Sequence, residues 1–213
     1  SAQKTRKSSV SMRRGILQEL LGTPSFLWAV FGQFFYVGAQ IGIWSYFIDF
    51  TKYSLPEVAE KTAAFTLSAS LLMFMVGRFT GTYFMRRVDP RRLLSIYALI
   101  NIVLMLIAII GAHIVSVIAL ALTSFFMSIM FPTIYGLGLK NLGDSAEIAS
   151  SIIIMAIISG AIIPPSMGYL ADETSIQLAY VIPLGCFVLV LLSSLAGGMV
   201  IKKRALTEIG VKQ

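Results

Sequence analysis

The chain has 213 residues, of which 57% are hydrophobic and only 13% are charged, and its formal net charge is +7. Soluble domains are typically about 45–50% apolar and about 25% charged, so this composition indicates an integral membrane protein. The single cysteine, Cys186, excludes an intramolecular disulfide and a cysteine-based metal cluster. The basic residues flank apolar runs instead of covering one soluble face, so we expect no nucleic-acid partner. We also expect no cofactor and no metal site.

Residues 1–24 are expected to form a cytoplasmic linker with a short helix. Residues 1–11 are basic and serine-rich without apolar periodicity, which is typical of a flexible segment. The stretch MRRGILQELLGT places Ile16, Leu17, Leu20 and Leu21 on one helical face and predicts an amphipathic helix at the membrane interface. Because the chain starts with Ser1 and shows no signal-peptide pattern, we expect it to be a segment of a longer protein.

Six apolar runs, each near the ~20 residues that a bilayer requires, predict an all-α membrane domain over residues 25–201. The expected spans are 25–48, 62–85, 93–111, 115–139, 148–170 and 179–201, followed by a cytoplasmic tail at 202–213. Thr23 followed by Pro24 predicts the start of the first helix. Ser54 and Glu57 have the spacing of a capping box, which predicts that the second helix starts close to them.

Lysine and arginine residues predict the orientation of these spans. Of the 17 in the sequence, 14 fall in the termini and in the loops on one side of the membrane. Only Lys52 and Lys61 fall in loops on the other side, and Arg78 lies within a span. By the positive-inside rule, both termini are expected to be cytoplasmic.

The first span carries a polar and aromatic face within GQFFYVGAQIGIWSYF. Its members are spaced at 0, 3, 7 and 11 residues: Gln33, Tyr36, Gln40 and Trp44. The fourth span repeats the pattern at 0, 4, 7 and 11 residues, with Ser124, Ser128, Phe131 and Tyr135. Pro132 and Gly136 are expected to interrupt this fourth helix.

The two faces together predict a substrate site near the bilayer midplane. The first and fourth spans would be equivalent members of two inverted three-helix repeats, and interrupted helices in such positions indicate a binding site. Any single polar residue could instead join two helices. Amides both donate to and accept from hydroxyl groups, and aromatic rings pack on the apolar face of a sugar. The predicted substrate residues are Gln33, Tyr36, Gln40, Trp44, Ser128, Phe131 and Tyr135.

A second set of residues is predicted to serve gating or structure. Arg78 is expected to snorkel or to pair with a loop carboxylate such as Asp89 or Asp144. Kinking of the fifth span is predicted at Ser159-Gly160 and Pro164-Pro165, for gating or for packing alone. The full set is Arg78, Asp89, Arg91, Pro132, Pro164 and Pro165.

Acidic residues and catalytic motifs are missing where an enzyme or a proton relay would need them. All ten Asp and Glu residues fall at span ends or in loops, so no carboxylate is expected near the membrane midplane. The sequence has no H-E-x-x-H, no G-x-S-x-G and no phosphate-binding glycine loop. An enzyme is therefore not predicted.

Three stretches in order resemble the fucose–galactose–hexose transporters of the major facilitator superfamily. They are GQFFYVGAQIGIWSYFIDF, GRFTGTYFMRRVDPRRLL and FFMSIMFPTIYGLGLKNLG. Their order and spacing match the seventh, eighth and tenth helices of that family, and the resemblance covers about residues 22–204. It implies the C-terminal six-helix half of a twelve-helix sugar–proton symporter of a bacterial inner membrane. The N-terminal half of that family supplies the carboxylates that carry the proton.

The resemblance also implies roles for particular residues. Gln33, Tyr36, Gln40 and Trp44 would line the central cavity, with Phe131 and Tyr135 facing them. The segment from GRFTG to RRVDPRR would be an inside-loop motif that stabilises a gate. The implied partners are a sugar of the fucose, galactose or glucose class, the lipid bilayer and the N-terminal six-helix half.

Two alternatives remain open from the sequence. A facilitator of another small polar solute would share the same fold and the same lining. A non-transporting membrane scaffold or receptor would not need the two polar-aromatic faces, and tight packing between them without a cavity would favour it.

Overall fold

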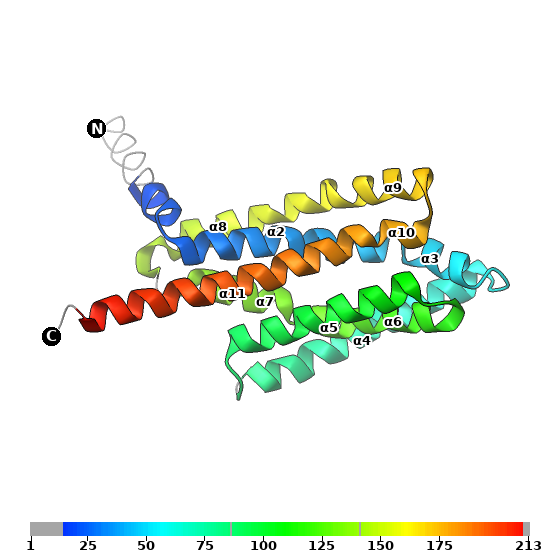
Figure 1. The fold of residues 1–213 in the computed structure, drawn as a ribbon, viewed down its shortest axis with the longest axis horizontal. Coiled ribbons are helices and arrows are strands. Elements are labelled where there is room, and N and C mark those ends of the chain that lie inside the picture. Colours follow the sequence, from blue (N-terminus) through cyan, green and yellow to red (C-terminus); the bar gives the residue numbers. More distant parts are fainter. Residues whose placement is uncertain (1–14, 86, 141, 211–213) are drawn as a thin grey trace, which may run out of the picture.

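The computed structural model describes residues 15–85, 87–140 and 142–210, and this part of the chain contains helices but no strand (Figure 1). Six helical segments in it are long and apolar enough to cross a membrane. They are Pro24–Ser45, Glu60–Met85, Pro90–Ile110, His113–Leu139, Ala146–Glu173 and Ile176–Met199. The six predicted spans are confirmed, and the chain is a multi-pass membrane protein.

Several spans are built from more than one helix. The first half of the domain consists of α2 (Pro24–Ser45), α3 (Phe47–Ser54), α4 (Glu60–Met85) and α5 (Pro90–Ile110). The second half consists of α6 (His113–Met127), α7 (Met130–Leu139), η1 (Gly143–Ser145), α8 (Ala146–Met155), η2 (Ala156–Ala161), α9 (Ile163–Glu173), α10 (Ile176–Ala179) and α11 (Val181–Gly210). The fourth, fifth and sixth spans are thus interrupted.

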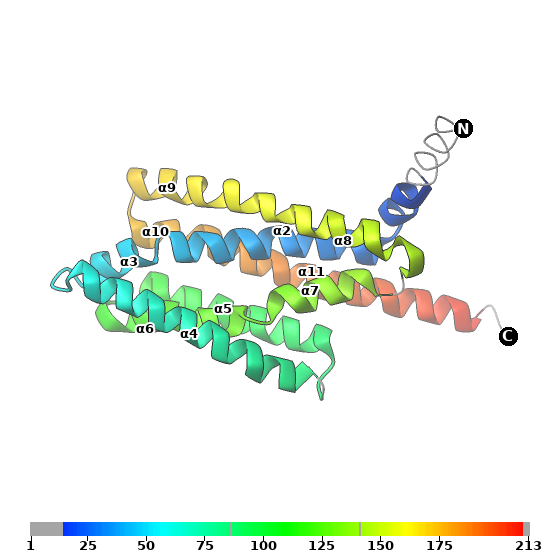
Figure 2. The ribbon, with the colours of Figure 1, turned by 180° about the vertical axis from the view of Figure 1, so that it is seen from behind.

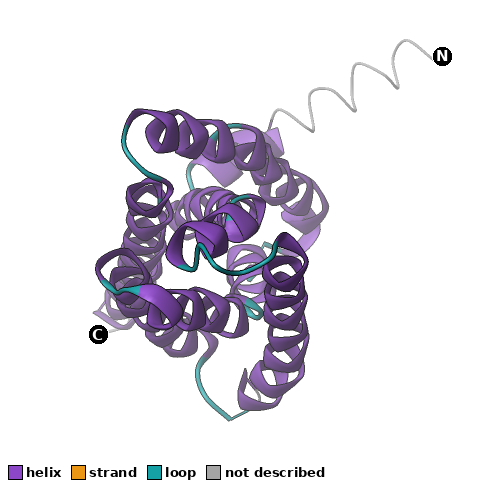
Figure 3. Cartoon of the chain, turned by 90° about the vertical axis from the view of Figure 1, so that its right-hand side faces the viewer, coloured by secondary structure: helices purple, strands orange, loops and turns teal. Residues whose placement is uncertain are grey.

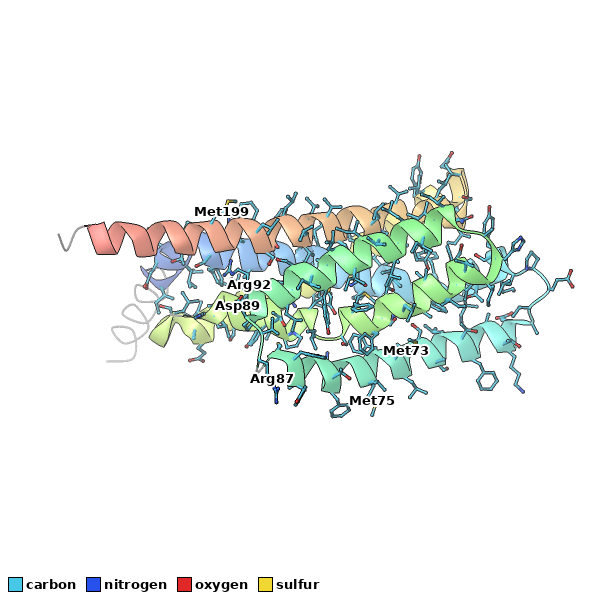
Figure 4. All side chains as sticks on the ribbon, turned by 60° about the horizontal axis from the view of Figure 1, so that its bottom comes forward. Met73, Met75, Arg87, Asp89, Arg92 and Met199 are labelled. Carbon is cyan, nitrogen blue, oxygen red and sulfur yellow. The ribbon has the colours of Figure 1, made fainter. Side chains whose placement is uncertain are left out.

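Helix α2 lies at the centre of the domain, and α4 lies at its edge (Figures 1 and 2). Figure 3 looks along the helices and shows how they surround the middle of the bundle. Helix α2 packs against α11, α7, η2 and α9, whereas α4 packs mainly against α6. The buried residues of α4 form one narrow stripe, Ala63, Ser70, Gly77 and Gly81. Its other faces are uncovered, and Met75 on the outer side is 56% exposed (Figure 4).

Of the two helix starts predicted from capping residues, the first is confirmed and the second is wrong. Helix α2 begins at Pro24 as predicted, although the Thr23 hydroxyl donates to the Glu19 carbonyl at 2.9 Å instead of capping α2. The predicted start of the second helix near Leu55, with Ser54 as its cap, is wrong, because Ser54 is the last residue of α3 and α4 begins at Glu60. The chain bends at Tyr46 and then continues as a separate helix beyond the predicted end of the first span.

The two predicted terminal segments are described only in part. Residues 1–14 of the linker lie outside the described residues, and residues 15–21 are helical as predicted. At the other end, α11 continues to Gly210 instead of ending near residue 201, so most of the predicted tail has helical backbone. Residues 211–213 lie outside the description.

Two glycines of the GRFTG stretch allow α4 to approach the fourth span closely. A Cβ atom at Gly77 would collide with the backbone carbonyl of Phe125 and with the hydroxyl of Ser128. A Cβ atom at Gly81 would collide with the side chain of Ile129. These positions bring α4 against the junction of α6 and α7, which is where the candidate site begins.

Gly77→Ala is therefore expected to lower the free energy of unfolding by about 1–3 kcal/mol, because a backbone carbonyl cannot move aside as a flexible side chain can. Gly136→Ala is the matched control, since Gly136 is exposed in α7 and its added Cβ would meet nothing within 4 Å. That control should be neutral or slightly stabilising, because alanine favours helix more than glycine does. Thermal unfolding of both variants in one detergent checks the prediction, and equal melting temperatures would contradict it.

Candidate substrate site

The fourth span is broken between Met127 and Met130. Helix α6 ends at Met127, α7 starts at Met130, and Ser128 and Ile129 lie between them. Pro132 has no N–H group, so the carbonyl of Ser128 four residues earlier receives no helical hydrogen bond from it. The predicted interruption by Pro132 is confirmed, and it falls on the residues before the proline. Gly136, by contrast, lies inside the continuous helix α7.

Two side chains from other helices donate to the carbonyls at this break. The Tyr36 hydroxyl of α2 donates to the Met127 carbonyl at 2.8 Å. The Nε atom of Arg78 on α4 donates to the Ser128 carbonyl at 3.3 Å. The guanidinium of Arg78 also lies over the Phe74 ring, 5.1 Å from its centroid. An unpaired carbonyl in an apolar medium costs several kcal/mol, so Tyr36 and Arg78 stabilise the broken conformation.

Three of the predicted substrate residues are buried behind the surface. Gln33, Tyr36 and Ser128 have no exposed surface in the described structure. The Ser128 hydroxyl donates to the Phe125 carbonyl at 2.7 Å. The two predicted faces thus pack partly against each other, and the lining role of Gln33, Tyr36 and Ser128 stays a prediction. Neither amide atom of Gln33 has a hydrogen-bond partner among the described residues.

Trp44, on the polar and aromatic face of α2, connects α2 to α4 and α6. Its indole Nε1 donates to the Ser124 hydroxyl of α6 at 3.1 Å. The Ser124 hydroxyl is in turn 2.6 Å from the hydroxyl of Ser70 on α4. The Trp44 ring also meets Phe74 of α4 edge to face, with 5.1 Å between the ring centroids. Trp44 keeps part of its surface accessible, so this contact fixes the ring without burying it.

The remaining accessible side chains of α2 and α7, together with Phe74 of α4, form a set that we call the aromatic wall. It consists of the half-buried residues Gln40, Trp44, Phe74, Phe131 and Tyr135. Phe131 stacks on Tyr135 with 6.5 Å between ring centroids and 15° between the planes. Phe131 also meets the Tyr36 ring at 6.4 Å. The aromatic wall thus contains one amide and four aromatic rings, and two of these rings, Phe131 and Tyr135, lie on α7 just after the break in the fourth span.

Phe74 was not predicted from the sequence, although its spacing gives a signal. Ser70, Phe74 and Arg78 follow one another at intervals of four residues, so they share a face of α4. Ser70 and Arg78 both bond to residues of the fourth span. A phenylalanine between two such polar residues therefore points toward the same neighbour.

The loop between α4 and α5 and the first turn of α5 hold the remaining charged candidates. Asp89 caps α5, and its Oδ1 accepts from the backbone N–H groups of Arg91 at 3.0 Å and Arg92 at 3.1 Å (Figure 4). Arg91 donates through Nη1 to the Ser194 carbonyl of α11 at 3.3 Å. Asp89 is therefore occupied as a helix cap, and Arg78 bonds a carbonyl. The side chain of Asp144, the other predicted partner of Arg78, is not described.

A cavity of about 470 Å³ lies beside this loop. It is lined by Met85, Asp89, Pro90, Arg91, Pro132, Thr133, Gly136, Leu137 and Lys140. These residues come from the end of α4, the α4–α5 loop, the start of α5, and α7 with its C-cap, at the end of the bundle where basic residues gather. The described geometry shows structural roles for Asp89 and Arg91, and it leaves their gating role as a proposal.

The fifth span is interrupted before its two prolines. The 3-10 segment η2 ends at Ala161, and Pro164 and Pro165 stand in the first turn of α9. The Pro164 carbonyl accepts from the Tyr46 hydroxyl at 3.1 Å. A Cβ atom at Gly38 of α2 would collide with Ile163, so the first and fifth spans are in close contact here. The predicted kink is confirmed, and the contacts that surround it are packing contacts.

The described part of the chain contains no group of three or more His, Cys, Asp or Glu residues that could hold a metal ion. The arrangement instead offers hydrogen-bonding and stacking groups on an apolar scaffold. Such a surface binds a neutral polar ligand by shape and hydrogen bonds.

The fold has known counterparts, although no family model matches the chain. It superposes with a TM-score of 0.79 on a crystal structure of a major facilitator superfamily transporter, FucP, in the outward conformation, at 41% identity. That match covers 81% of this chain and 42% of the other. A variant of the Escherichia coli fucose:proton symporter FucP matches with a TM-score of 0.84 at 40% identity, over 85% of this chain and 45% of the other. The chain thus has the fold of one six-helix half of a major facilitator superfamily transporter.

Curated relatives indicate which transporters of this class the chain resembles in sequence. The chain is 44% identical over 176 residues to the L-fucose-proton symporter of Escherichia coli, covering 82% of this chain and 40% of that protein. It is 37% identical over 186 residues to a putative glucose/galactose transporter of Helicobacter pylori, covering 84% of this chain and 45% of that protein. The chain is a homologue of the fucose and glucose/galactose transporters and matches the C-terminal half of their fold. It spans less than half the length of these relatives.

Proposed function

We propose that this chain forms half of a secondary active sugar transporter and supplies one wall of its central cavity. The aromatic wall carries the proposal, because it presents an amide and several accessible aromatic rings beside a broken membrane helix. The curated relatives are named for the transport of fucose, glucose and galactose, which agrees with such a lining. The proposed substrate is therefore a neutral hexose or deoxyhexose.

Each group on the aromatic wall has a function in this proposal. The Gln40 amide donates to one sugar hydroxyl and accepts from another. The rings of Trp44, Phe74 and Phe131 pack against the C–H face of the sugar. Arg78 uses Nε on the Ser128 carbonyl, and its two Nη groups are further donors next to Phe74. Tyr36 acts behind the wall, where its hydroxyl holds the Met127 carbonyl at the break.

Proton coupling is proposed to depend on a second six-helix half. The Asp and Glu residues of this chain occupy loops and helix ends, so none is placed to carry a proton at the midplane. The uncovered faces of α4 and of α8–α9 are where such a half would pack. Alternating access would then arise from rocking of the two halves around the sugar.

The proposed location is a bacterial inner membrane with both termini in the cytoplasm. A cysteine at exposed Glu57 should then react with an impermeant thiol reagent added to intact cells. A cysteine at exposed Arg87 should react only after the membrane is opened. Both variants are made in a background without other reactive cysteines. Reaction of the Arg87→Cys variant in intact cells would show that the proposed orientation is wrong.

The alternatives differ in how they use the aromatic wall. A facilitator would bind the same solute but would not accumulate it. A scaffold would bury both polar faces completely, and the full burial of Tyr36, Gln33 and Ser128 agrees with that alternative. Gln40, Trp44, Phe131 and Tyr135 nevertheless keep accessible surface, and the relatives carry transporter names.

Uptake by the full-length carrier in liposomes tests the proposed function. Labelled L-fucose, D-galactose and D-glucose are supplied in turn under an inside-alkaline pH gradient. We expect accumulation of at least one sugar above its external concentration, and loss of that accumulation when a protonophore dissipates the gradient. Equilibration without accumulation would favour a facilitator. If none of the three sugars enters, the sugar-transport proposal is wrong.

A further inference from the structure

The helix formed by residues 15–21, which we call the leading helix, docks on the end of the bundle (Figure 1). Leu20 has no exposed surface, and Ile16 is half-buried. Leu17 and Leu21 remain 39% and 64% exposed. Of the apolar face predicted for this helix, Ile16 and Leu20 contact the bundle, whereas Leu17 and Leu21 remain exposed.

Leu20 fills a small apolar cluster that is separate from the main core. The fully buried members of this end cluster are Leu20, Phe26, Ala149 and Ile153. Side chains packed around them include Tyr135 and Leu139 of α7. The end cluster thus joins the leading helix to α2, α7 and α8, and it includes one residue of the aromatic wall.

Short polar contacts fix the leading helix on both sides. The Glu19 carboxylate accepts from the Ser145 hydroxyl at 3.2 Å, next to the start of α8. Only Gly22 and Thr23 separate the leading helix from α2. The N–H groups of these two residues donate back into the leading helix at 3.0 Å, to the carbonyls of Gln18 and Leu20. The leading helix is therefore rigidly joined to α2.

A continuous series of contacts connects the end cluster to the break in the fourth span. Tyr135 packs on the end cluster and stacks on Phe131. Phe131 meets the ring of Tyr36, and the Tyr36 hydroxyl donates to the Met127 carbonyl at the break. Closely packed side chains have few alternative arrangements, so a change at one end of such a series displaces its neighbours.

We propose that Leu20 is a positioning residue for the sugar site: by filling the end cluster it holds Tyr135, and through Phe131 and Tyr36 it holds the break at residues 127–130. The effect on sugar affinity rests on the proposed function, whereas the effect on the break rests on the packing alone. Leu17 lies on the same helix and is exposed, so it provides a matched control.

Hydrogen–deuterium exchange of the full-length carrier in lipid nanodiscs tests this role. In Leu20→Ala, amide exchange at residues 127–131 should accelerate about tenfold, because local opening of the break becomes easier. The affinity for whichever of L-fucose, D-galactose and D-glucose binds the wild type should fall about fivefold or more. Leu17→Ala should match the wild type in both measurements. Faster exchange confined to residues 15–22 and 146–153, with wild-type rates at the break, would overturn the proposal.

A cross-linked variant covers the case in which Leu20→Ala does not fold. Leu20→Cys/Ala149→Cys pairs two members of the end cluster, and Cys186 is buried and does not compete. Exchange at residues 127–131 should be slower in the oxidised form than in the reduced form of the same sample. Equal rates would overturn the positioning role. If the wild type binds none of the three sugars, the proposed function fails, and the exchange comparison still decides the role of Leu20.

Discussion

Replacing Gln40 with leucine should weaken sugar binding about 5- to 150-fold while leaving thermal stability unchanged. The Gln40 amide is half-buried on the aromatic wall and makes no hydrogen bond among the described residues. It is therefore solvated when the wall is open and exchanges water for sugar hydroxyls on binding. Leucine would leave a sugar hydroxyl unpaired, at a cost of about 1–3 kcal/mol. Calorimetric titration and thermal unfolding of one preparation of the full-length carrier measure both effects.

Gln33→Leu is the matched control for this experiment, since Gln33 belongs to the same helical face. Its amide is buried and has no partner among the described residues, so removing it should not lower stability. The loss of affinity should also be smaller than for Gln40→Leu. Normal sugar binding together with reduced stability in Gln40→Leu would assign that residue to helix packing.

These 213 residues alone are expected to show no uphill sugar uptake in liposomes with an imposed pH gradient. The physical reason is the position of the carboxylates, all of which lie in loops or near helix ends in the sequence: Glu19, Asp49, Glu57, Glu60, Asp89, Asp144, Glu147, Asp172, Glu173 and Glu208. Proton-driven transport needs a group that binds and releases a proton within the membrane.

The full-length carrier in the same liposomes serves as the positive control for this experiment. Labelled L-fucose, D-galactose and D-glucose are used with both preparations. Accumulation of any of them by the isolated chain, abolished by a protonophore, would contradict the assignment of coupling to a second half.

The spans were predictable because membrane insertion depends on local apolar length, which the sequence contains directly. The break in the fourth span was predictable for a similar reason, since the missing N–H of Pro132 acts on a carbonyl only four residues away. The pairing of that carbonyl with Arg78 was not predictable, because it depends on how closely Gly77 lets α4 approach.

Helical spacing correctly grouped Tyr36 and Gln40 on one side of α2, but it could not tell which neighbour each of them meets. Tyr36 reaches a carbonyl of α6 and is buried, whereas Gln40, one turn further along, stays accessible. The face of a helix is a property of its sequence, and the burial of each residue on that face is a property of the packing. Ser128 shows the same limit, because its hydroxyl bonds to the Phe125 carbonyl of its own span.

The second helix start shows where local signals fail. Ser54 and Glu57 have capping-box spacing, yet α3 extends through Ser54 and α4 begins only at Glu60. The bend at Tyr46 allows a second short helix, in which Phe47 and Phe50 are fully buried. Burial of these two rings is a tertiary effect, and it outweighs the single capping interaction that the spacing offers, which is worth about 1 kcal/mol.

The position of the bound sugar can be measured directly by photolabelling the full-length carrier with diazirine derivatives of L-fucose, D-galactose and D-glucose. If the aromatic wall binds the sugar, labelled peptides should contain Gln40 and Trp44 of α2 and Phe131 and Tyr135 of α7. An excess of the unmodified sugar should remove this labelling. Two results would contradict a sugar site on the aromatic wall. The labelling that unmodified sugar removes could lie only around Asp89 and Lys140, or it could be absent from both the α2 peptide and the α7 peptide.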